Sequence, residues 1–441
     1  MLRYKIYIFR ALLAGSVMMI LYGSSHYLNH FYTVQIIGNY IDSNLSNQEK
    51  SVLGDKFCKC DSIDLKVDEL FITNTDMLID SLIGYEFSIK KLLYFTLPRI
   101  YSDPNKTTIL PKTKYYKARV SANIINGEIK QTGGMIDHID SDRYSFRIKT
   151  KDTLILGSTK MNFYNPKCRF GGIYEWVGHE LLDSAGLISL KTGYLNITIN
   201  NIYKGLYFYQ QQPTLKTIED NNRAQGLIIR LVLSEMKDQS LRIENIYDKG
   251  SFDNRLNFKM QYRHLSEKIM KYNNEEISAQ EIFSMEALGK YCSIIDLING
   301  YHALELRNYY FYFNPKDSLL EPIGREFNTS FYKSIPVYNG LGFKSPIRFN
   351  QNKYISNNFK NMVKDFKLDS SSYEKLFGFY IKELVALTSP KYLESFFDFR
   401  KSELKKRQYC LYKSNPKFKT FEDSHYYKNR NAILRYLKTL K

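Results

Sequence analysis

The segment from Tyr144 to Lys151 alternates apolar and polar side chains with a period of two, which is the pattern of a β-strand with one buried face. Its polar face carries three cations, Arg147, Lys149 and Lys151. Such a row is costly to remove from water unless an anion neutralises it, so one interpretation is a strand that faces a polyphosphate. The other interpretation is a solvated edge strand whose charges discourage aggregation.

The rest of the sequence predicts an α+β protein. Alternation between residues 115 and 151 indicates several strands, with turns at Asn126-Gly127 and Gly133-Gly134. Further strands are expected at 194–199, 203–209 and 309–313, and apolar residues three and four apart predict helices at 173–185, 288–302, 373–387, 392–412 and 429–440.

A series of short motifs runs through the middle of the chain in one unbroken order. The motifs are Thr132–His138, Ser145–Lys149, Lys160–Phe163, Asn165–Arg169, Glu175–Trp176, Ile199–Asn201, Gly205–Tyr207, Gly226–Ile229 and Leu320–Gly324. In this order they resemble the spore-coat-protein-H-type (CotH) kinase family, in the large membrane-tethered or exported form found in bacteria. The resemblance covers residues 116–330, or about half of the chain.

The resemblance implies an atypical protein-kinase-like fold with two lobes. The first is strand-rich and extends to about residue 231, and the second is mainly helical. The implied activity is transfer of the γ-phosphate of ATP to hydroxyls of extracytoplasmic or envelope proteins, with Mg²⁺ or Mn²⁺. This reaction needs a cation on the phosphates, oxygen ligands for the metal and a base that orients the acceptor.

The resemblance also assigns roles to individual residues. Lys149 is expected to hold the phosphates with help from Arg147, and Glu175, near the start of a helix, is expected to orient Lys149. Asn308 and Glu326 are the expected metal ligands.

Two residues compete for the role of orienting the acceptor. Asp296 lies on a stripe of small residues within a predicted helix, where it could equally bond a neighbouring loop. His302 lies on the apolar face of the same segment, where a histidine can also belong to the core.

Several positions depart from the family pattern. Gln210 and Gln211 stand where the family has a pair of glutamates near the nucleotide or metal, so hydrogen bonding is kept but two negative charges are lost. Ala303 stands five residues before Asn308, where a conventional kinase has its base, and Glu326 replaces a metal-binding aspartate. The alternative function is therefore a catalytically weak or inactive envelope scaffold.

A zinc site is another alternative. His179 and Asp183 are four residues apart with Glu180 between them, as in a zincin helix with aspartate replacing the second histidine. The sequence offers no third ligand motif for such a site.

Composition limits the function classes. The 441 residues are 44% hydrophobic, enough for a full core and for two or three domains or lobes. The net charge of +18 makes nucleic acid or an anionic membrane candidate partners. No helix-turn-helix, finger or aromatic-basic repeat accompanies the scattered basic residues, so no nucleic-acid partner is expected. Five cysteines, an odd number, leave at least one unpaired within the chain.

The N-terminus predicts export. An apolar run from Ala11 to Tyr22 follows three basic residues, Arg3, Lys5 and Arg10. The run fits a signal-peptide core, and with the apolar residues before it could serve as an uncleaved anchor whose positive end stays inside. We expect a single N-terminal pass at the cell membrane with the domain outside the cytoplasm, the alternative being a secreted or periplasmic protein. The predicted regions are the signal anchor or signal peptide at 1–29, an N-terminal extension without a predicted function at 30–115, the CotH-kinase-like core at 116–330 and a helical C-terminal region at 331–441.

Overall fold

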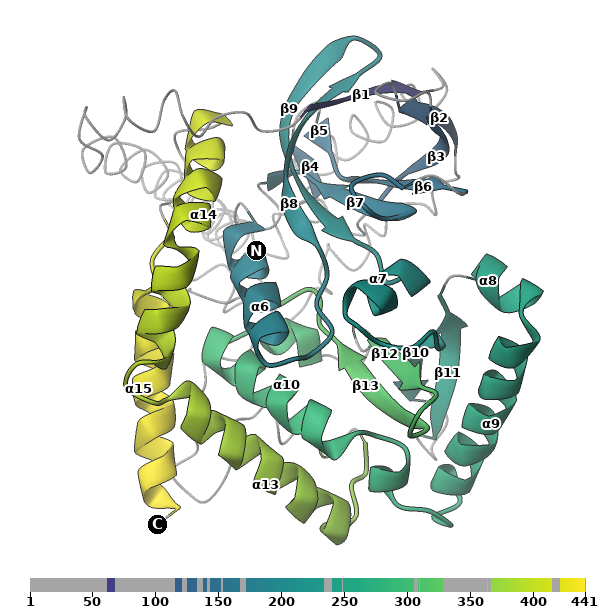
Figure 1. Ribbon diagram of the computed structural model, residues 1–441, viewed down its shortest axis with the longest axis vertical. Helices are drawn as coiled ribbons and strands as arrows, with labels where there is room; N and C mark the ends of the chain where they lie inside the picture. Colours follow the sequence, from purple (N-terminus) through teal and green to yellow (C-terminus); the bar gives the residue numbers. More distant parts are fainter. Residues whose placement is uncertain are drawn as a thin grey trace, which may run out of the picture.

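The structure, a computed structural model, shows two lobes (Figure 1). It describes residues 62–67, 116–120, 125–132, 138–140, 143–151, 154–166, 172–233, 240–247, 249–304, 308, 310–327, 363, 366–414 and 421–440. The predicted membrane segment at 1–29 lies outside these residues. Among the residues that the structure does describe, no helix is both long and apolar enough to cross a membrane.

The upper lobe in Figure 1 is a closed barrel. Its strands, in order around the barrel, are β1 (Ser62–Val67), β2 (Tyr116–Val120), β3 (Ile125–Gln131), β6 (Phe146–Thr150), β7 (Lys160–Tyr164), β9 (Ile202–Gln211) and β8 (Thr192–Ile199). Neighbours are antiparallel except β1 and β8, which pair in parallel. A two-stranded sheet of β4 (Ile139–Asp140) and β5 (Arg143–Tyr144) accompanies the barrel. Because β1 comes from the N-terminal extension, that extension contributes a strand that closes the barrel.

The barrel interior is a packed apolar core. Phe146 and Ile148 of β6 point inward, as the alternation predicted, and they are joined there by Met161, Phe163 and Tyr207. The rings of Phe146 and Phe163 stack with centroids 5.1 Å apart. Since side chains fill the interior, polar chemistry on this lobe has to use the outer face of the barrel.

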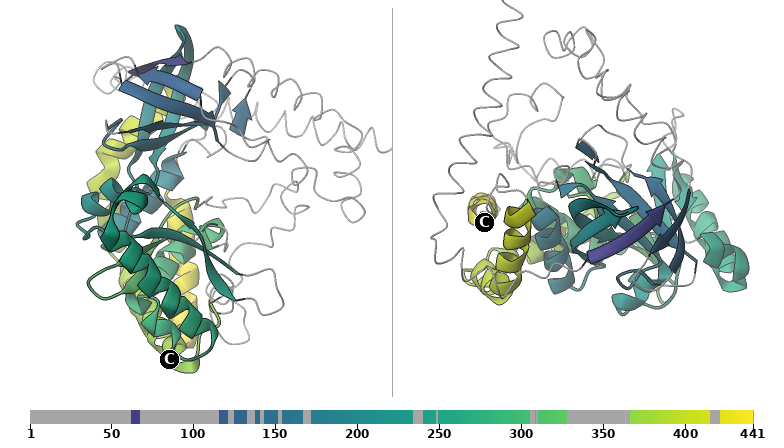
Figure 2. Two further views of the ribbon diagram at one scale, coloured as in Figure 1. Left: turned by 90° about the vertical axis from the view of Figure 1, so that its right-hand side faces the viewer. Right: turned by 90° about the horizontal axis from the view of Figure 1, so that it is seen from above.

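The second lobe combines a four-stranded antiparallel sheet with helices. The strand order is β11 (Leu241–Ile246), β10 (Ile228–Leu233), β12 (Tyr310–Asn314) and β13 (Leu319–Ile323). The helices are α7 (Leu215–Asp220), α8 (Lys249–Asn254), α9 (Leu256–Asn273), α10 (Met285–Ile298), α13 (Ser370–Leu387), α14 (Tyr392–Ser414) and α15 (Ser424–Thr439), with short 3₁₀ turns η3 (Ala279–Glu281) and η4 (Tyr301–Leu304). The side view in Figure 2 shows the barrel at one end of the molecule and this lobe at the other.

Helix α6 (Ile173–Ser184) lies between the barrel and the rest of the second lobe (Figure 1). It begins after Gly172, whose φ is +75°. A Cβ at Gly172 would lie 2.4 Å from the ring of Phe208 on β9, so only glycine allows the helix to start this close to the barrel. The predicted apolar stripe is buried, with Trp176 and Leu181 among its members.

The α+β class agrees with the sequence prediction, but the lobe boundary does not. Strand β10 pairs with β11 and β12, not with the barrel, so the strand-rich lobe ends with β9 at Gln211 and not near residue 231. The second lobe therefore has a sheet of its own. Helices α13 and α15 pack on α10 within one continuous core, which makes the described part of 331–441 an integral part of this lobe.

Of the five cysteines, the structure describes Cys292 and Cys410. Cys292 in α10 is free and buried, which confirms that at least one cysteine is unpaired. Cys410 in α14 is disulfide-bonded.

Candidate functional site

A row of polar side chains crosses the outer face of the barrel. Strand register places Lys130 opposite Arg147, Arg147 opposite Asn162, Asn162 opposite Gln210, and Gln210 opposite Thr192. Residues opposite each other in an antiparallel pair point to the same face, so these side chains form one line from β3 to β8. Asn162 and Gln210 are buried at the lobe junction, while Lys130 and Arg147 are half-buried.

Arg147 is fixed at the edge of this junction. Its Nε donates to Oδ1 of Asn162 at 2.7 Å, and Nδ2 of Asn162 donates to the hydroxyl of Tyr164 at 2.6 Å. Burial lowers the pKa of Lys130, and the Arg147 and Lys149 cations lower it further. The end of the row at β3 and β6 is therefore a site where a bound anion would relieve repulsion between cations.

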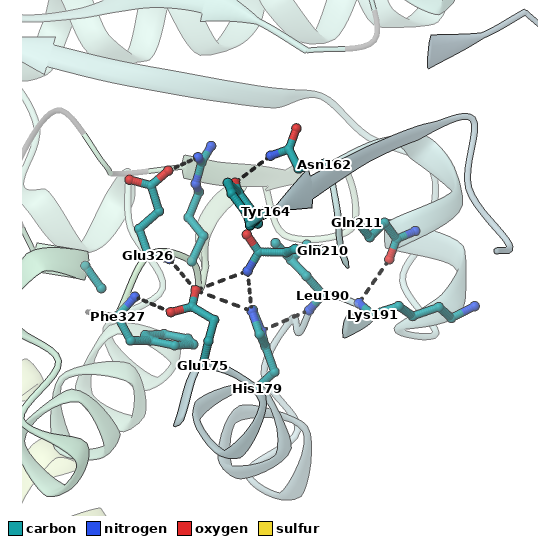
Figure 3. A network of polar contacts seen from close by, with 12 residues as sticks. Asn162, Tyr164, Glu175, His179, Leu190, Lys191, Gln210, Gln211, Glu326 and Phe327 are labelled. Carbon is teal, nitrogen blue, oxygen red and sulfur yellow. Dashed lines mark hydrogen bonds and ion pairs between the residues drawn. The ribbon is translucent and has the colours of Figure 1, made fainter. Parts of the chain in front are cut away.

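Glu175 joins three elements at the junction (Figure 3). Its Oε1 accepts hydrogen bonds from Nε2 of Gln210 at 3.1 Å and from the backbone N–H of Glu326 at 2.8 Å. Its Oε2 accepts from the N–H of Phe327 at 3.1 Å. The side chain is only 4% exposed, so α6, β9 and the loop after β13 meet on one buried carboxylate.

His179, one turn after Glu175, completes the network. Its Nδ1 accepts from the N–H of Leu190 at 3.2 Å, and its Nε2 lies 2.9 Å from Nε2 of Gln210 and 4.0 Å from Oε1 of Glu175. The hydrogen bond from Leu190 helps to hold the ring edge-on against Phe327, with centroids 5.0 Å apart. His179 therefore packs α6 against β9 and the loop after β13.

The described residues do not support the zinc interpretation of this helix. Glu180, the expected base, bonds Arg400 of α14 at 2.9 Å, and Asp183 is exposed to solvent. Within the part of the chain that the structure describes, no group of three or more His, Cys, Asp or Glu side chains could hold a metal ion.

The loop after β13 carries a buried ion pair. Arg325 is 7% exposed, pairs with the carboxylate of Glu326 and lies over the ring of Tyr310, 4.2 Å from its centroid. Burial alone would lower the pKa of Arg325, but Glu326 and nearby tyrosines keep this pKa above its usual value. Glu326 itself has a φ of +54°, an uncommon conformation for a residue other than glycine and one that often marks functional sites.

His302 lies beside Glu326, and Asn308 in turn bonds His302. Nε2 of His302 is 3.8 Å from Oε2 of Glu326. Nδ2 of Asn308 donates to the backbone carbonyl of His302 at 2.8 Å, which leaves the amide oxygen of Asn308 as its atom for a metal. One carboxylate and one amide oxygen suit Mg²⁺, which takes few protein ligands and completes its shell with phosphate and water oxygens.

Six of the nine predicted residues are thus linked, directly or through one neighbour, by contacts and strand register across the lobe junction. They are Arg147, Glu175, Gln210, His302, Asn308 and Glu326.

Lys149 does not make the expected pair with Glu175. Its ammonium lies 3.1 Å from Glu128 on β3, and both side chains are 48% exposed. Register explains the difference, because Glu128 stands directly opposite Lys149 and the two side chains share the outer face. Glu175 is instead bonded to backbone amides, so its observed role is to hold a loop.

Gln211 and Asp296 also lie elsewhere. Gln211 shares the inward face of the barrel with Met161, and its Oε1 accepts from the N–H of Lys191 at 3.3 Å. Asp296 is fully buried at 0% exposure and accepts a hydrogen bond from the Tyr380 hydroxyl at 2.6 Å. A carboxylate enclosed between α10 and α13 cannot reach the hydroxyl of a substrate protein, so the predicted role of Asp296 in orienting the acceptor is wrong for this structure.

Sequence reasoning missed Asn162, Tyr164 and Arg325 as members of the network. The alternation in Lys160–Phe163 would have placed Asn162 on the same face as Arg147, had the pairing of β6 with β7 been assumed. Arg325 gave no comparable signal, because its burial depends on packing between the lobes.

A scan of protein-family models finds no match for this chain, and a search of curated proteins finds no matching relative.

Proposed function

We propose that this protein is an atypical kinase of the CotH type, which uses ATP and Mg²⁺ or Mn²⁺ to phosphorylate hydroxyls of extracytoplasmic or envelope proteins. The observation that supports the proposal is that Glu175 bonds both Gln210 and the backbone of Glu326 at the lobe junction, while Arg147 lies two strands from Gln210 on the same barrel face. Phosphoryl transfer depends on positioning and charge neutralisation, which this arrangement of cations, carboxylates and amides can supply.

Each residue has a distinct task in this proposal. Arg147 binds phosphate oxygens at the edge of the barrel, where its Nε is already fixed by Asn162. Glu326 and Asn308 hold the metal, which neutralises charge on the phosphates. His302 takes the proton of the acceptor hydroxyl as its oxygen bonds to the γ-phosphorus and the bond to ADP breaks. Glu175 fixes the backbone that carries Glu326.

A second candidate function, a catalytically weak or inactive envelope scaffold, is favoured by the ion pair between Arg325 and Glu326. The Arg325 guanidinium competes with a metal ion for the Glu326 carboxylate. Gln210 is neutral, so it adds no negative charge that would attract the metal. The two candidates therefore differ first in whether Glu326 binds a divalent ion in the presence of nucleotide.

The proposed location is the outer side of the cell membrane, with the N-terminal segment as anchor; a secreted or periplasmic protein is the alternative. The disulfide at Cys410 supports either location, because disulfides persist in oxidising compartments.

The test is thermal unfolding of the exported domain with millimolar ATP and Mg²⁺ or Mn²⁺. A ligand that binds only the folded state raises the Tm. At a hundredfold excess over its Kd, the ligand stabilises the folded state by about 2.7 kcal/mol. We expect Glu326→Ala to remove the metal-dependent part of the shift. The absence of any metal-dependent shift in the wild type would favour the scaffold.

A matched pair of variants tests the phosphate-binding cation. Arg147→Met should weaken ATP binding more than Lys149→Met, because Arg147 is fixed at the junction while Lys149 pairs with Glu128 on an exposed part of the barrel. Both variants remove one positive charge from the same strand, so the comparison holds charge constant. A larger loss of ATP affinity in Lys149→Met would contradict this assignment.

A further inference from the structure

Helix α14 runs along α6 and reaches both lobes (Figure 1). It contacts strands β8 and β9 of the barrel, helix α6, and helix α13 of the second lobe. Helix α6 presents two different faces. Glu175 and His179 bond the network described above, while Trp176, Glu180 and Ser184, spaced four residues apart, contact arginines of α14.

Arg400 of α14 binds the last turns of α6. Its Nε donates to Oε2 of Glu180 at 2.9 Å, and its Nη2 donates to Oγ of Ser184 at 2.9 Å. Its guanidinium also lies 4.0 Å from the centroid of the Phe396 ring, which holds the side chain in place. Helix α6 has no basic residue in its own last turn, so Arg400 supplies the cation that a helix C-terminus favours.

Arg407, two turns further along α14, binds α6 and the barrel together. Its guanidinium lies over the ring of Trp176 at 4.5 Å and near that of Tyr194 on β8 at 5.7 Å. Its Nη2 donates to the backbone carbonyl of Thr192 at 3.3 Å, and its Nε forms an ion pair with Glu403 at 2.9 Å. The side chain is only 11% exposed, and a desolvated cation over tryptophan is a favourable contact.

We propose that Arg400 and Arg407 are positioning residues that fix α6 so that Glu175 can hold the loop carrying Glu326. The connection is continuous: α14 binds one face of α6, and the Glu175 carboxylate on the other face accepts the N–H groups of Glu326 and Phe327. No side chain caps the start of α6. Contacts with neighbouring elements therefore fix where this helix lies. This inference rests on contacts alone, whereas its consequence for metal and nucleotide binding rests on the proposed function.

Hydrogen exchange of the Glu326 and Phe327 amides tests the proposal without any nucleotide. The variant carries both Arg400→Gln and Arg407→Gln and is studied with its disulfide intact. We expect these amides to exchange roughly tenfold faster in it, since loss of a hydrogen bond to a charged group shifts the local opening equilibrium by about that factor. The amides of β7 in the barrel and of α10 should keep their protection. Lys405→Gln together with Lys406→Gln, two exposed residues of α14, is the control that removes the same two charges, and it should change none of these amides.

Fluorescence of Trp176 separates the outcomes, because this is the only tryptophan in the chain. A changed Trp176 emission together with faster exchange at residues 326 and 327 supports positioning. A changed emission with unaltered exchange there overturns it, and so does faster exchange spread equally over β7 and α10. If the double variant does not fold, Arg407→Lys keeps the charge but loses the planar contact, and the same two measurements decide. Both measurements are made without nucleotide, so this test remains valid even if the kinase proposal fails.

Discussion

Glu175 is a buried carboxylate whose donors come from two lobes. Burying an ionised group is costly unless hydrogen bonds replace its water, and three N–H groups do so here. Two of them belong to the backbone of the loop after β13 and the third to Gln210. The residue therefore links α6 to that loop, which differs from the ion pair with a lysine that the helix glutamate forms in protein kinases.

This arrangement predicts the effect of Glu175→Gln on stability. In the variant an N–H₂ group replaces one carboxylate oxygen and faces an N–H donor that this oxygen accepted from, so at least one hydrogen bond is lost. We expect a loss of about 1–3 kcal/mol in the free energy of unfolding, measured by urea denaturation. Glu128→Gln breaks a half-exposed ion pair and should cost less than about 1 kcal/mol. Equal losses in the two variants would contradict this account.

Asp369 shows how a cap residue makes stability depend on pH. It caps α13, where its carboxylate accepts from the N–H and hydroxyl of Ser372 at 2.9 and 2.6 Å and from the N–H of Ala279 at 3.1 Å. Burial would raise the pKa of Asp369, but these hydrogen bonds lower it below its usual value. A lowered pKa in the folded state means that the stabilisation is complete above the unfolded pKa and is lost as the pH falls through the folded one.

We therefore expect Asp369→Ala to cost about 1 kcal/mol at neutral pH, the typical effect of losing an N-cap. The difference from the wild type should shrink as the pH falls below about 4, the ordinary range of an aspartate. Urea denaturation at a series of pH values measures this difference. A constant or growing difference in acid would show that the cap does not act through its charged form.

At the scale of elements, patterns of spacing predicted most helices and strands but not their partners. The helix at 173–185 and the hairpin turn at Asn200-Asn201 are confirmed, because periodicity and turn residues are local signals. Register is not local, so the pairing of Lys149 with Glu128 and the inward face of Gln211 could not be read from the sequence. The burial of Asp296 against Tyr380 depends on α13, more than eighty residues later in the chain.

Helix α9 shows a different limit of sequence reasoning. Only Phe258, Leu265 and Ile269 of its eighteen residues are buried. So sparse an apolar stripe gives a weak periodic signal, and no pattern predicted this helix. The region of β10 was included in the strand-rich lobe expected to extend to about residue 231, but its partners β11 and β12 come later in the chain and belong to the second lobe.

The two glycines that flank α6 give a matched prediction. Gly172 and Gly186 have φ values of +75° and +71°, so alanine at either position is strained by about 1–2 kcal/mol. A Cβ at Gly172 would also meet the Phe208 ring, whereas one at Gly186 meets nothing within 4 Å. We expect Gly172→Ala to cost roughly 1–3 kcal/mol more than Gly186→Ala in urea denaturation. Similar costs would mean that the start of α6 can move away from β9.

At the scale of the whole molecule, the lobes are joined by one continuous core. Tyr164, Tyr194 and Phe208 on the outer face of the barrel pack in the same apolar cluster as α6 and α10. Helix α14 adds contacts to both lobes, and its residue Cys410 is disulfide-bonded. The candidate site therefore lies on a shared interface, where a change in either lobe reaches Glu175 and Glu326.

The last prediction concerns the location of the molecule. The basic residues before the apolar run at 11–22 favour keeping the N-terminus in the cytoplasm. The chain after the run should therefore lie outside the cytoplasmic membrane. Protease added to spheroplasts should digest the domain while a cytoplasmic marker stays intact. Cys292 and Cys410 are both buried, so labelling is done on the unfolded protein. A thiol reagent should then label Cys292 at once but Cys410 only after reduction, because disulfides are maintained outside the cytoplasm. Full protection of the domain from protease, with Cys410 labelled before any reduction, would place the chain inside the cell and remove extracytoplasmic proteins as its substrates.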